Sequence, residues 1–107
     1  MRRMHFKAVE LRGDSMAPTY NEGDWLLFIG LPANVKSLLG KVILIQRASG
    51  AGSDFLQIKR AIRIDGANIW VEGDNKESST DSRSWGAISS DEIIGKLLFR
   101  YRKGPRR

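Results

Sequence analysis

The chain has 107 residues, of which 41% are apolar and 28% charged, and its formal net charge is +6. This length predicts a single domain over residues 1–107, because two independent cores would each be too small to offset the loss of chain entropy. The balance of apolar and charged residues is that of a folded domain. No cysteine is present, so disulfides, thiolate metal sites and cysteine nucleophiles are excluded.

The longest apolar run covers residues 25–33 and contains Gly30 and Pro32. It is far shorter than the ~20 residues that a membrane-spanning helix needs. The basic N-terminus is not followed by the apolar segment of a secretory signal. We therefore expect a cytoplasmic protein without a transmembrane anchor.

The excess of positive charge lies at the two ends of the chain, with a basic tail at about residues 102–107. Basic ends can engage nucleic acid, an anionic membrane surface or an acidic partner. The simpler interpretation is a solvated tail. Aromatic residues are not interleaved with basic ones except near the C-terminus, so we expect no specific nucleic-acid partner. The oligomeric state does not follow from the sequence.

Short runs rich in β-branched and aromatic residues alternate with clusters of Gly, Asn, Asp and Ser, which predicts a mainly β fold. A hairpin is expected to turn through Asp65 and Gly66, a dipeptide suited to the positive φ of a tight turn. Helix is limited to a turn within residues 32–40 and another within residues 89–94, and residues 47–54 form a flexible loop. The predicted strands cover residues 6–11, 24–30, 41–47, 55–64, 68–72 and 93–101.

Lys59 lies on a predicted strand whose residues alternate between two faces. It falls on the less apolar face, so the strand pattern alone predicts a solvated side chain. The more apolar face has Arg60 as its one charged member. The Lys59 face also carries Phe55, Gln57, Ala61 and Arg63, and the apolar face carries Leu56, Ile58, Ile62 and Ile64.

Several common catalytic and metal-binding arrangements are missing from the chain. A Ser-His-Asp triad needs a histidine, and the one histidine, His5, lies at a terminus expected to fray. Glu72 and Asp74 could form a carboxylate pair, but no motif positions one. The segment DNKESSTD lacks the central glycine and final glutamate of a calcium loop, and GAGSD lacks the ending of a phosphate loop. We therefore expect no metal and no cofactor.

The hydrolytic chemistry that remains is a serine activated by a lysine. Ser15 lies on a tight turn, where Gly13 allows close backbone approach and Pro18 fixes the direction in which the chain leaves. The lysine must be neutral near pH 7, so its pKa must fall by about 2 to 3 from about 10.4. A buried strand position without a nearby carboxylate would achieve this.

Three segments carry motifs in a recognisable order. Residues 13–28 read GDSMAPTYNEGDWLLF, residues 58–62 read IKRAI, and residues 71–96 read VEGDNKESSTDSRSWGAISSDEIIGK. They resemble, in that order, the nucleophile box, the base box and the last box of the type I signal peptidase family. The resemblance covers most of the chain. It implies a compact signal-peptidase-like β-sheet catalytic core with one or two short helical turns.

The resemblance also implies the chemistry, a serine endopeptidase with a Ser/Lys dyad. Ser15 would be the nucleophile and Lys59 the general base, while Ser79 would orient the lysine amine. The Ser15 backbone N–H would supply one oxyanion donor, and Gly13 occupies the position where some members carry a serine that supplies the other. Among the supporting residues, Asp81 and Arg83 would form a structural ion pair. The adjoining turn would be shaped by Gly73, Asp74 and Asn75. Met16 and Pro18 would form the wall of the nucleophile turn.

Within that family the chain resembles the small soluble nickel-type superoxide dismutase maturation proteases. Lys59 and Gly73 are one hairpin apart, where many members have a large insertion, and residues 100–101 read Arg-Tyr as in those enzymes. The implied reaction is removal of an N-terminal leader or propeptide from a protein substrate. Small residues would precede the cleavage site, and the substrate would add as a strand to a free edge near residues 6–11 or before Lys59.

Two alternatives remain. A self-cleaving repressor domain also uses a Ser/Lys dyad, but it would usually carry a helix-turn-helix and a cleavage segment before the serine, and fourteen residues precede Ser15 here. The other alternative is a non-catalytic β-domain that keeps the boxes as structure and binds nucleic acid or acidic protein through its basic tail.

Overall fold

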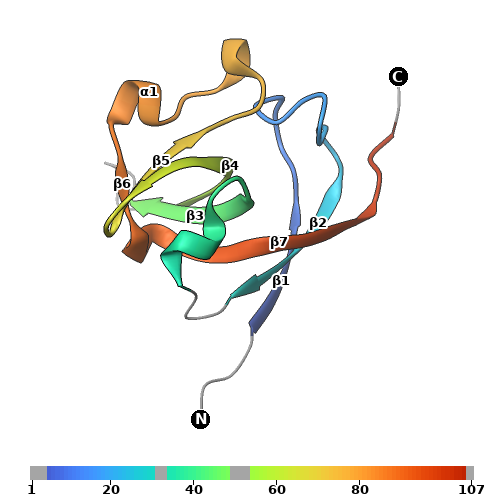
Figure 1. The fold of residues 1–107 in the computed structure, drawn as a ribbon. Helices are drawn as coiled ribbons and strands as arrows, with labels where there is room; N and C mark the ends of the chain where they lie inside the picture. Colours follow the sequence, from blue (N-terminus) through green and yellow to red (C-terminus); the bar gives the residue numbers. More distant parts are fainter. Residues whose placement is uncertain (1–4, 31–33, 49–53, 106–107) are drawn as a thin grey trace.

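The computed structural model describes residues 5–30, 34–48 and 54–105, which build one antiparallel sheet of seven strands in the order β1-β2-β7-β3-β4-β5-β6 (Figure 1). The expected mainly β fold is confirmed. In the described ranges no helix has the length and apolar content needed to cross a bilayer. The elements are β1 (His5–Glu10), β2 (Trp25–Gly30), η1 (Val35–Leu38), β3 (Val42–Ala48), β4 (Asp54–Asp65), β5 (Asn68–Glu72), η2 (Lys76–Ser78), α1 (Ser82–Trp85), β6 (Ile88–Ser89), η3 (Ser90–Glu92) and β7 (Ile93–Arg102).

The predicted strands agree with β1 to β5 and β7 to within one residue at each end. The two predicted helical turns are the 3₁₀ turns η1 and η3, and Ser89 caps η3 as its sequence indicates. The short elements β6, η2 and α1 were not predicted. His5 does not fray but begins β1, where it pairs with Gly30. Residues 49–53 of the predicted loop lie outside the described residues.

The hairpin between β4 and β5 is confirmed, but it turns one residue later than expected. Asp65 still belongs to β4 and pairs with Asn68, so the two loop residues are Gly66 and Ala67. Gly66 has a φ of 63°, and no described residue other than glycine has a positive φ. A positive φ at the first loop position alone is the II′ form, which places glycine there.

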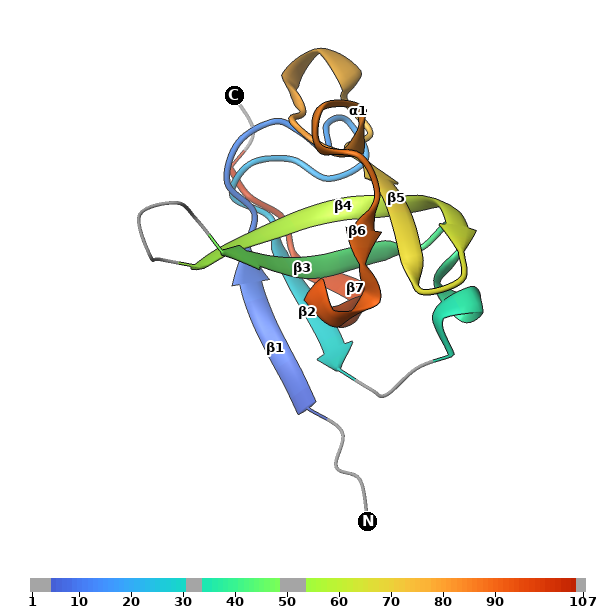
Figure 2. The ribbon, with the colours of Figure 1, turned by 90° about the vertical axis from the view of Figure 1, so that its left-hand side faces the viewer.

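The sheet curls strongly, so that β1 runs across the direction of β3 and β4 (Figure 2). Apolar residues therefore pack on both of its faces. Strand β3 shows this directly, because Val42 and Leu44 enter one cluster and Ile43 and Ile45 enter the other. The first cluster also contains Leu11, Met16, Leu26, Phe28 and Ile58, and the second contains Leu38, Ala61, Ile69, Val71 and Ile88.

The expected division of β4 into an apolar and a polar face is wrong. Lys59 is 4% exposed and Ala61 is buried, whereas Leu56 and Ile62 are 43% and 44% exposed. One cause is the second apolar cluster, which covers the face that the pattern assigned to solvent. The other is a register shift against β5 between Ala61 and Arg63, which interrupts the alternation.

Candidate active site

Ser15 lies in the loop of residues 11–24 that connects β1 to β2, which we call the Ser15 loop. Overlapping turns build it: the Ala17 N–H donates to the Asp14 carbonyl at 3.1 Å and the Tyr20 N–H to the Met16 carbonyl at 2.9 Å. Met16 is fully buried in the first cluster, which anchors the turn beside Ser15 in the core. The Ala17–Pro18 peptide bond is cis.

Lys59 is a buried lysine on β4, paired across the sheet with Ile43. Its amine donates to the Ser79 hydroxyl oxygen at 3.0 Å. Burial lowers the pKa of Lys59; nearby Asp81 raises it in part and Arg83 lowers it again. Removing a cation from water disfavours its charged form, so burial on β4 favours the neutral amine that a base requires.

Ser79, Asp81 and Arg83 form a short hydrogen-bonded chain behind the amine. The Ser79 hydroxyl donates to Asp81 Oδ2 at 2.6 Å, and Arg83 makes a bidentate pair with the same carboxylate through Nε and Nη2, both at 3.0 Å. A serine hydroxyl has one proton, which Ser79 uses in its hydrogen bond to Asp81, so Ser79 offers Lys59 only a lone pair. A neutral lysine that donates one N–H to Ser79 keeps its own lone pair for another partner.

The expectation that a lysine base would have no carboxylate nearby is not met, since Ser79, which accepts from the Lys59 amine, donates to the Asp81 carboxylate. The negative charge of Asp81 is instead balanced by Arg83. Burial alone would raise the pKa of Asp81, but hydrogen bonds from Arg83, Ser79 and the Gly73 N–H outweigh it and hold that pKa far below its usual range. The carboxylate therefore stays ionised, and Arg83 offsets its attraction for a charged Lys59.

The turn at residues 73–75 holds the Ser15 loop against this chain. The Asn75 N–H donates to the Ser15 carbonyl at 2.8 Å, and the Asn75 side-chain amide donates to the Asp14 carbonyl at 3.0 Å. The Gly73 N–H donates to Asp81 at 2.9 Å. A Cβ at Gly73 would lie 2.6 Å from the Ser15 carbonyl oxygen, so a side chain there would push the two segments apart.

Arg60 is a structural residue that the sequence patterns missed. Its guanidinium makes a bidentate pair with Asp74, both distances 2.8 Å, and donates to the Gly40 carbonyl at 2.9 Å. The pair lowers the pKa of Asp74 and ties the residue after Lys59 to the turn that holds Ser15. The possible carboxylate pair of Glu72 and Asp74 does not form, because Glu72 accepts from the Trp70 indole at 2.7 Å.

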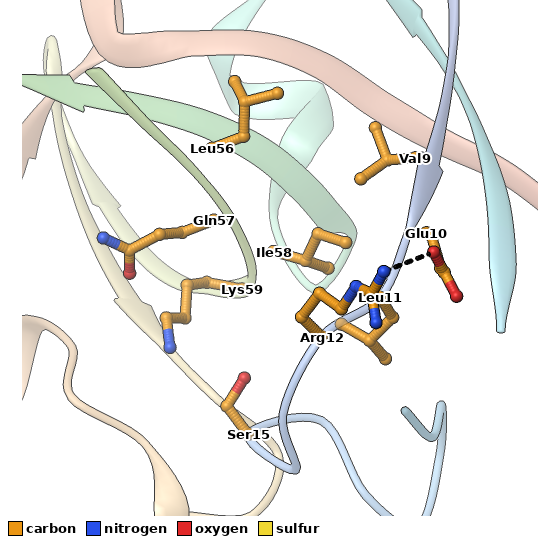
Figure 3. Close-up of a pocket in the computed structure, with 9 residues that line it drawn as sticks. All are labelled: Val9, Glu10, Leu11, Arg12, Ser15, Leu56, Gln57, Ile58 and Lys59. Atoms are coloured by element: carbon orange, nitrogen blue, oxygen red, sulfur yellow. Dashed lines mark ion pairs between the residues drawn. The ribbon is translucent and has the colours of Figure 1, made fainter. Parts of the chain in front are cut away.

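Ser15 and Lys59 meet at the end of a cleft of about 220 Å³, and Figure 3 shows the serine hydroxyl and the lysine amine pointing toward each other. Residues 9–12 line one wall and residues 56–59 the other. Both walls are free strand edges: in the described sheet β1 pairs with β2 alone, and the pairing of β4 with β5 begins at Arg60. Val9, Leu11, Leu56 and Ile58 supply aliphatic side chains to the cleft, and Glu10, Arg12 and Gln57 supply polar ones.

The residues selected from the sequence lie on three segments of the chain. Gly13, Ser15, Met16 and Pro18 belong to the Ser15 loop, Lys59 belongs to β4, and the others belong to residues 73–83. Of these, Ser15 and Lys59 line the cleft. Gly13 has a φ of 79° and no side chain that could act as a second oxyanion donor, and its N–H donates to Glu22 at 3.1 Å. Across the described ranges no three acidic or histidine side chains gather in a way that could hold a metal ion.

The buried Asp81 carboxylate predicts a specific pH dependence of stability. Its folded-state pKa is lower than the unfolded value of about 3.9, so its contribution to stability is fully present above that value and is lost as the pH falls below it. Asp81→Asn should lower the free energy of unfolding at pH 7 and flatten its decline between about pH 4 and pH 2. Urea unfolding at several pH values measures both.

The matched control for this prediction is Asp65→Asn, because Asp65 is exposed at the end of β4. It should keep the wild-type pH dependence. An Asp81→Asn variant that loses stability in acid as steeply as the wild type would contradict the prediction.

Comparison with known proteins identifies relatives that match parts of this chain. A family model described as "Signal peptidase, peptidase S26" matches residues 40–102. Mitochondrial inner membrane protease subunit 2 of Saccharomyces cerevisiae is 30% identical over 113 aligned positions, covering 83% of this chain and 64% of the yeast protein.

Two further relatives match over shorter stretches. Signal peptidase IB of Staphylococcus aureus is 55% identical over 31 residues, 29% of this chain and 16% of its own length. Probable signal peptidase I-1 of Synechocystis sp. is 42% identical over 41 residues, 38% of this chain and 21% of its own length. The chain thus spans less than two thirds of each of these three relatives. With the family model matching more than half of its residues, the chain belongs to the signal peptidase S26 family.

Proposed function

We propose that this protein is a serine endopeptidase of the signal peptidase I type, in which Ser15 and Lys59 form the catalytic dyad. The observation that carries the proposal is the buried Lys59 amine beside the Ser15 hydroxyl at the end of a cleft with two free strand edges. Membership of the signal peptidase S26 family supports the same reaction.

The two free edges favour an extended peptide as substrate. A peptide strand that enters between β1 and β4 can accept and donate backbone hydrogen bonds on either side, which gives affinity without sequence preference. The aliphatic side chains of the cleft, Val9, Leu11, Leu56 and Ile58, favour small apolar residues before the scissile bond. Leader or propeptide segments with small residues before the cut fit both conditions.

In the proposed reaction the neutral Lys59 amine takes the proton of the Ser15 hydroxyl as the serine oxygen attacks the peptide carbonyl carbon. The Ser15 N–H stabilises the oxyanion, and the ammonium of Lys59 returns the proton to the leaving amine as the C–N bond breaks. The product is an ester of Ser15 with the new C-terminus of the leader. Lys59 then takes a proton from water as the water oxygen attacks the ester carbon, and it returns that proton to the Ser15 oxygen as the ester C–O bond breaks, which restores the serine and the neutral amine.

The finer proposal is that the substrate is the proform of a nickel-type superoxide dismutase. It is supported by the compact layout, in which a single hairpin separates Lys59 from Gly73, and by the resemblance of the Arg-Tyr ending of β7 to the maturation proteases of that enzyme. Location in the cytoplasm, where such a proform would be made, is part of the same proposal.

Removal of either dyad member should abolish cleavage while the fold is kept. Ser15→Ala and Lys59→Met should each lower kcat for a fluorogenic peptide with alanine before the cut by roughly 1,000-fold or more. Methionine is chosen because it fills a buried site without a charge. Full activity in either folded variant would sink the mechanism.

The matched controls are Ser90→Ala and Lys36→Ala, because both residues lie on 3₁₀ turns outside the cleft. They should leave kcat within about twofold of the wild type. Circular dichroism and thermal unfolding check that every variant folds.

The pH–rate profile reports the protonation of the base. Because Lys59 acts as a neutral amine, kcat/KM should rise with pH to a plateau, with a midpoint below the ordinary lysine value of about 10.4. Arg83→Gln should move the midpoint to higher pH, because the cation that helps to lower the pKa of Lys59 is lost. A profile whose midpoint is the same with and without Arg83 would argue against Lys59 as the titrating base.

The substrate is tested with purified proproteins. A nickel-type superoxide dismutase proform and a secretory preprotein should be incubated with the enzyme at equal concentration, and the products identified by mass spectrometry and N-terminal sequencing. We expect accurate removal of the superoxide dismutase propeptide and a kcat/KM for it at least about tenfold above that for the preprotein. The reverse preference would exclude the finer proposal and leave the peptidase proposal in place.

A further inference from the structure

The Ser15 loop is closed at its base by Asp24, a wholly buried carboxylate directly before β2. A buried carboxylate is costly unless it is paired and hydrogen-bonded. Asp24 Oδ2 accepts from the Asn21 N–H at 2.8 Å and from Arg100 at 3.1 Å, and Oδ1 accepts from the Gly104 N–H at 2.7 Å. Two of the three donors come from residues 100–105, which we call the C-terminal clasp.

The clasp lies directly against the backbone of the loop. Gly104 is buried, and a Cβ added to it would lie 2.6 Å from the carbonyl carbon of Gly23 and 2.7 Å from the carbonyl oxygen of Glu22. Both neighbours are backbone atoms, so they cannot yield by rotating a side chain. Position 104 therefore requires glycine because the two backbone segments approach so closely, and not because of a positive φ.

The clasp also reaches the part of the loop next to the nucleophile. The Arg100 guanidinium, which pairs with Asp24, lies 5.5 Å over the ring of Tyr20. The Tyr20 N–H donates to the carbonyl of Met16, the residue after Ser15. Arg100 therefore contacts the loop both at its base and one turn from Ser15.

The base of the loop is closed by a reciprocal pair of backbone hydrogen bonds. The Leu11 N–H donates to the Asp24 carbonyl and the Gly23 N–H to the Leu11 carbonyl, each at 2.8 Å. Leu11 packs in the first apolar cluster and lines the cleft. A displacement of Asp24 would therefore be transmitted to both ends of the loop.

We propose that the C-terminal clasp positions Ser15 for attack, with Asp24 as the positioning residue through which Arg100 and Gly104 act. This inference rests on the proposed function. The amine of Lys59 is held by a separate set of groups, Ser79, Asp81 and Arg83, so the clasp sets the place of the nucleophile without altering the base. A nucleophile moved by about 1 Å can lose about a hundredfold in rate.

The test uses Gly104→Ala, which opens the clasp by steric contact, and Asp24→Asn, which keeps one acceptor oxygen and is the milder change. Each should lower kcat for the fluorogenic peptide about tenfold or more and leave KM within about twofold. The midpoint of the pH–rate profile should not move, because the surroundings of Lys59 are unchanged. Lys103→Ala, at an exposed neighbour of Gly104, should match the wild type.

A second control separates positioning from general loss of stability. Ile29→Ala removes buried volume near the end of β2 that lies away from the loop, where Ile29 pairs with Phe6 and Lys96, and it should lower the free energy of unfolding with little change in kcat. If kcat falls as much in Ile29→Ala as in the clasp variants at equal loss of stability, the proposal is overturned.

A readout independent of activity is hydrogen exchange at the amide of Asn75, which donates to the Ser15 carbonyl. We expect faster exchange at this amide and at Leu11 in both clasp variants than in Ile29→Ala. Unchanged exchange would overturn the clasp. A wild-type protein that cleaves no peptide would defeat the proposed function, whereas the exchange data would still decide whether the clasp holds Ser15 in place.

Discussion

The burial of Lys59 is the constraint on which the rest of the site depends. An ammonium group inside a protein is unfavourable, and its position on β4 is tolerated because the amine can be neutral and because Ser79 accepts one of its N–H groups. The compensating charges are placed one step away, as a pair of Asp81 and Arg83 whose net charge is zero. Asp81 thereby orders Ser79 without holding Lys59 in its charged form.

The curl of the sheet places that lysine in the interior and also opens the cleft. In a flat sheet of seven strands, the face of β4 that carries Lys59 would be either buried along its whole length or exposed along its whole length. Here the second apolar cluster and the segment of residues 73–85 cover it near Lys59, while the curl brings the free edge of β1 toward the first half of β4. Because the same strand carries Lys59 and one wall of the cleft, a peptide paired with β4 would lie in register with the lysine.

The sequence predicts the strands well because their hydrophobic residues and turn signals are local. Six strands follow from such patterns, and the first four residues of β3 form an unbroken apolar run because both faces of the strand are buried there. The environment of Lys59 could not be predicted in this way. Its face is buried by residues that arrive from η1, β5 and β6, and the register shift near Ile62 breaks the period on which the assignment of faces depended.

The candidate site residues were found through motifs, whereas the contacts that hold them were not. The resemblance selected Ser79 and Asn75, which lie at the Lys59 amine and at the Ser15 carbonyl. No pattern indicates that Arg60 pairs with Asp74 or that Asp24 binds Gly104. These pairs join residues 14 and 80 positions apart, and periodicity carries no information about partners at such separations.

The two halves of the site are held by different means, and this difference has a physical reason. Lys59 belongs to a strand whose backbone is fixed by the ladder with β3, so a few side-chain contacts suffice to aim its amine. Ser15 belongs to a loop of turns without a ladder, which must be fixed by contacts at several points: Met16 in the core, Asn75 at the Ser15 carbonyl and Asp24 at the base. A residue on an irregular loop can reach a precise position in this way, provided that distant segments of the chain supply the anchors.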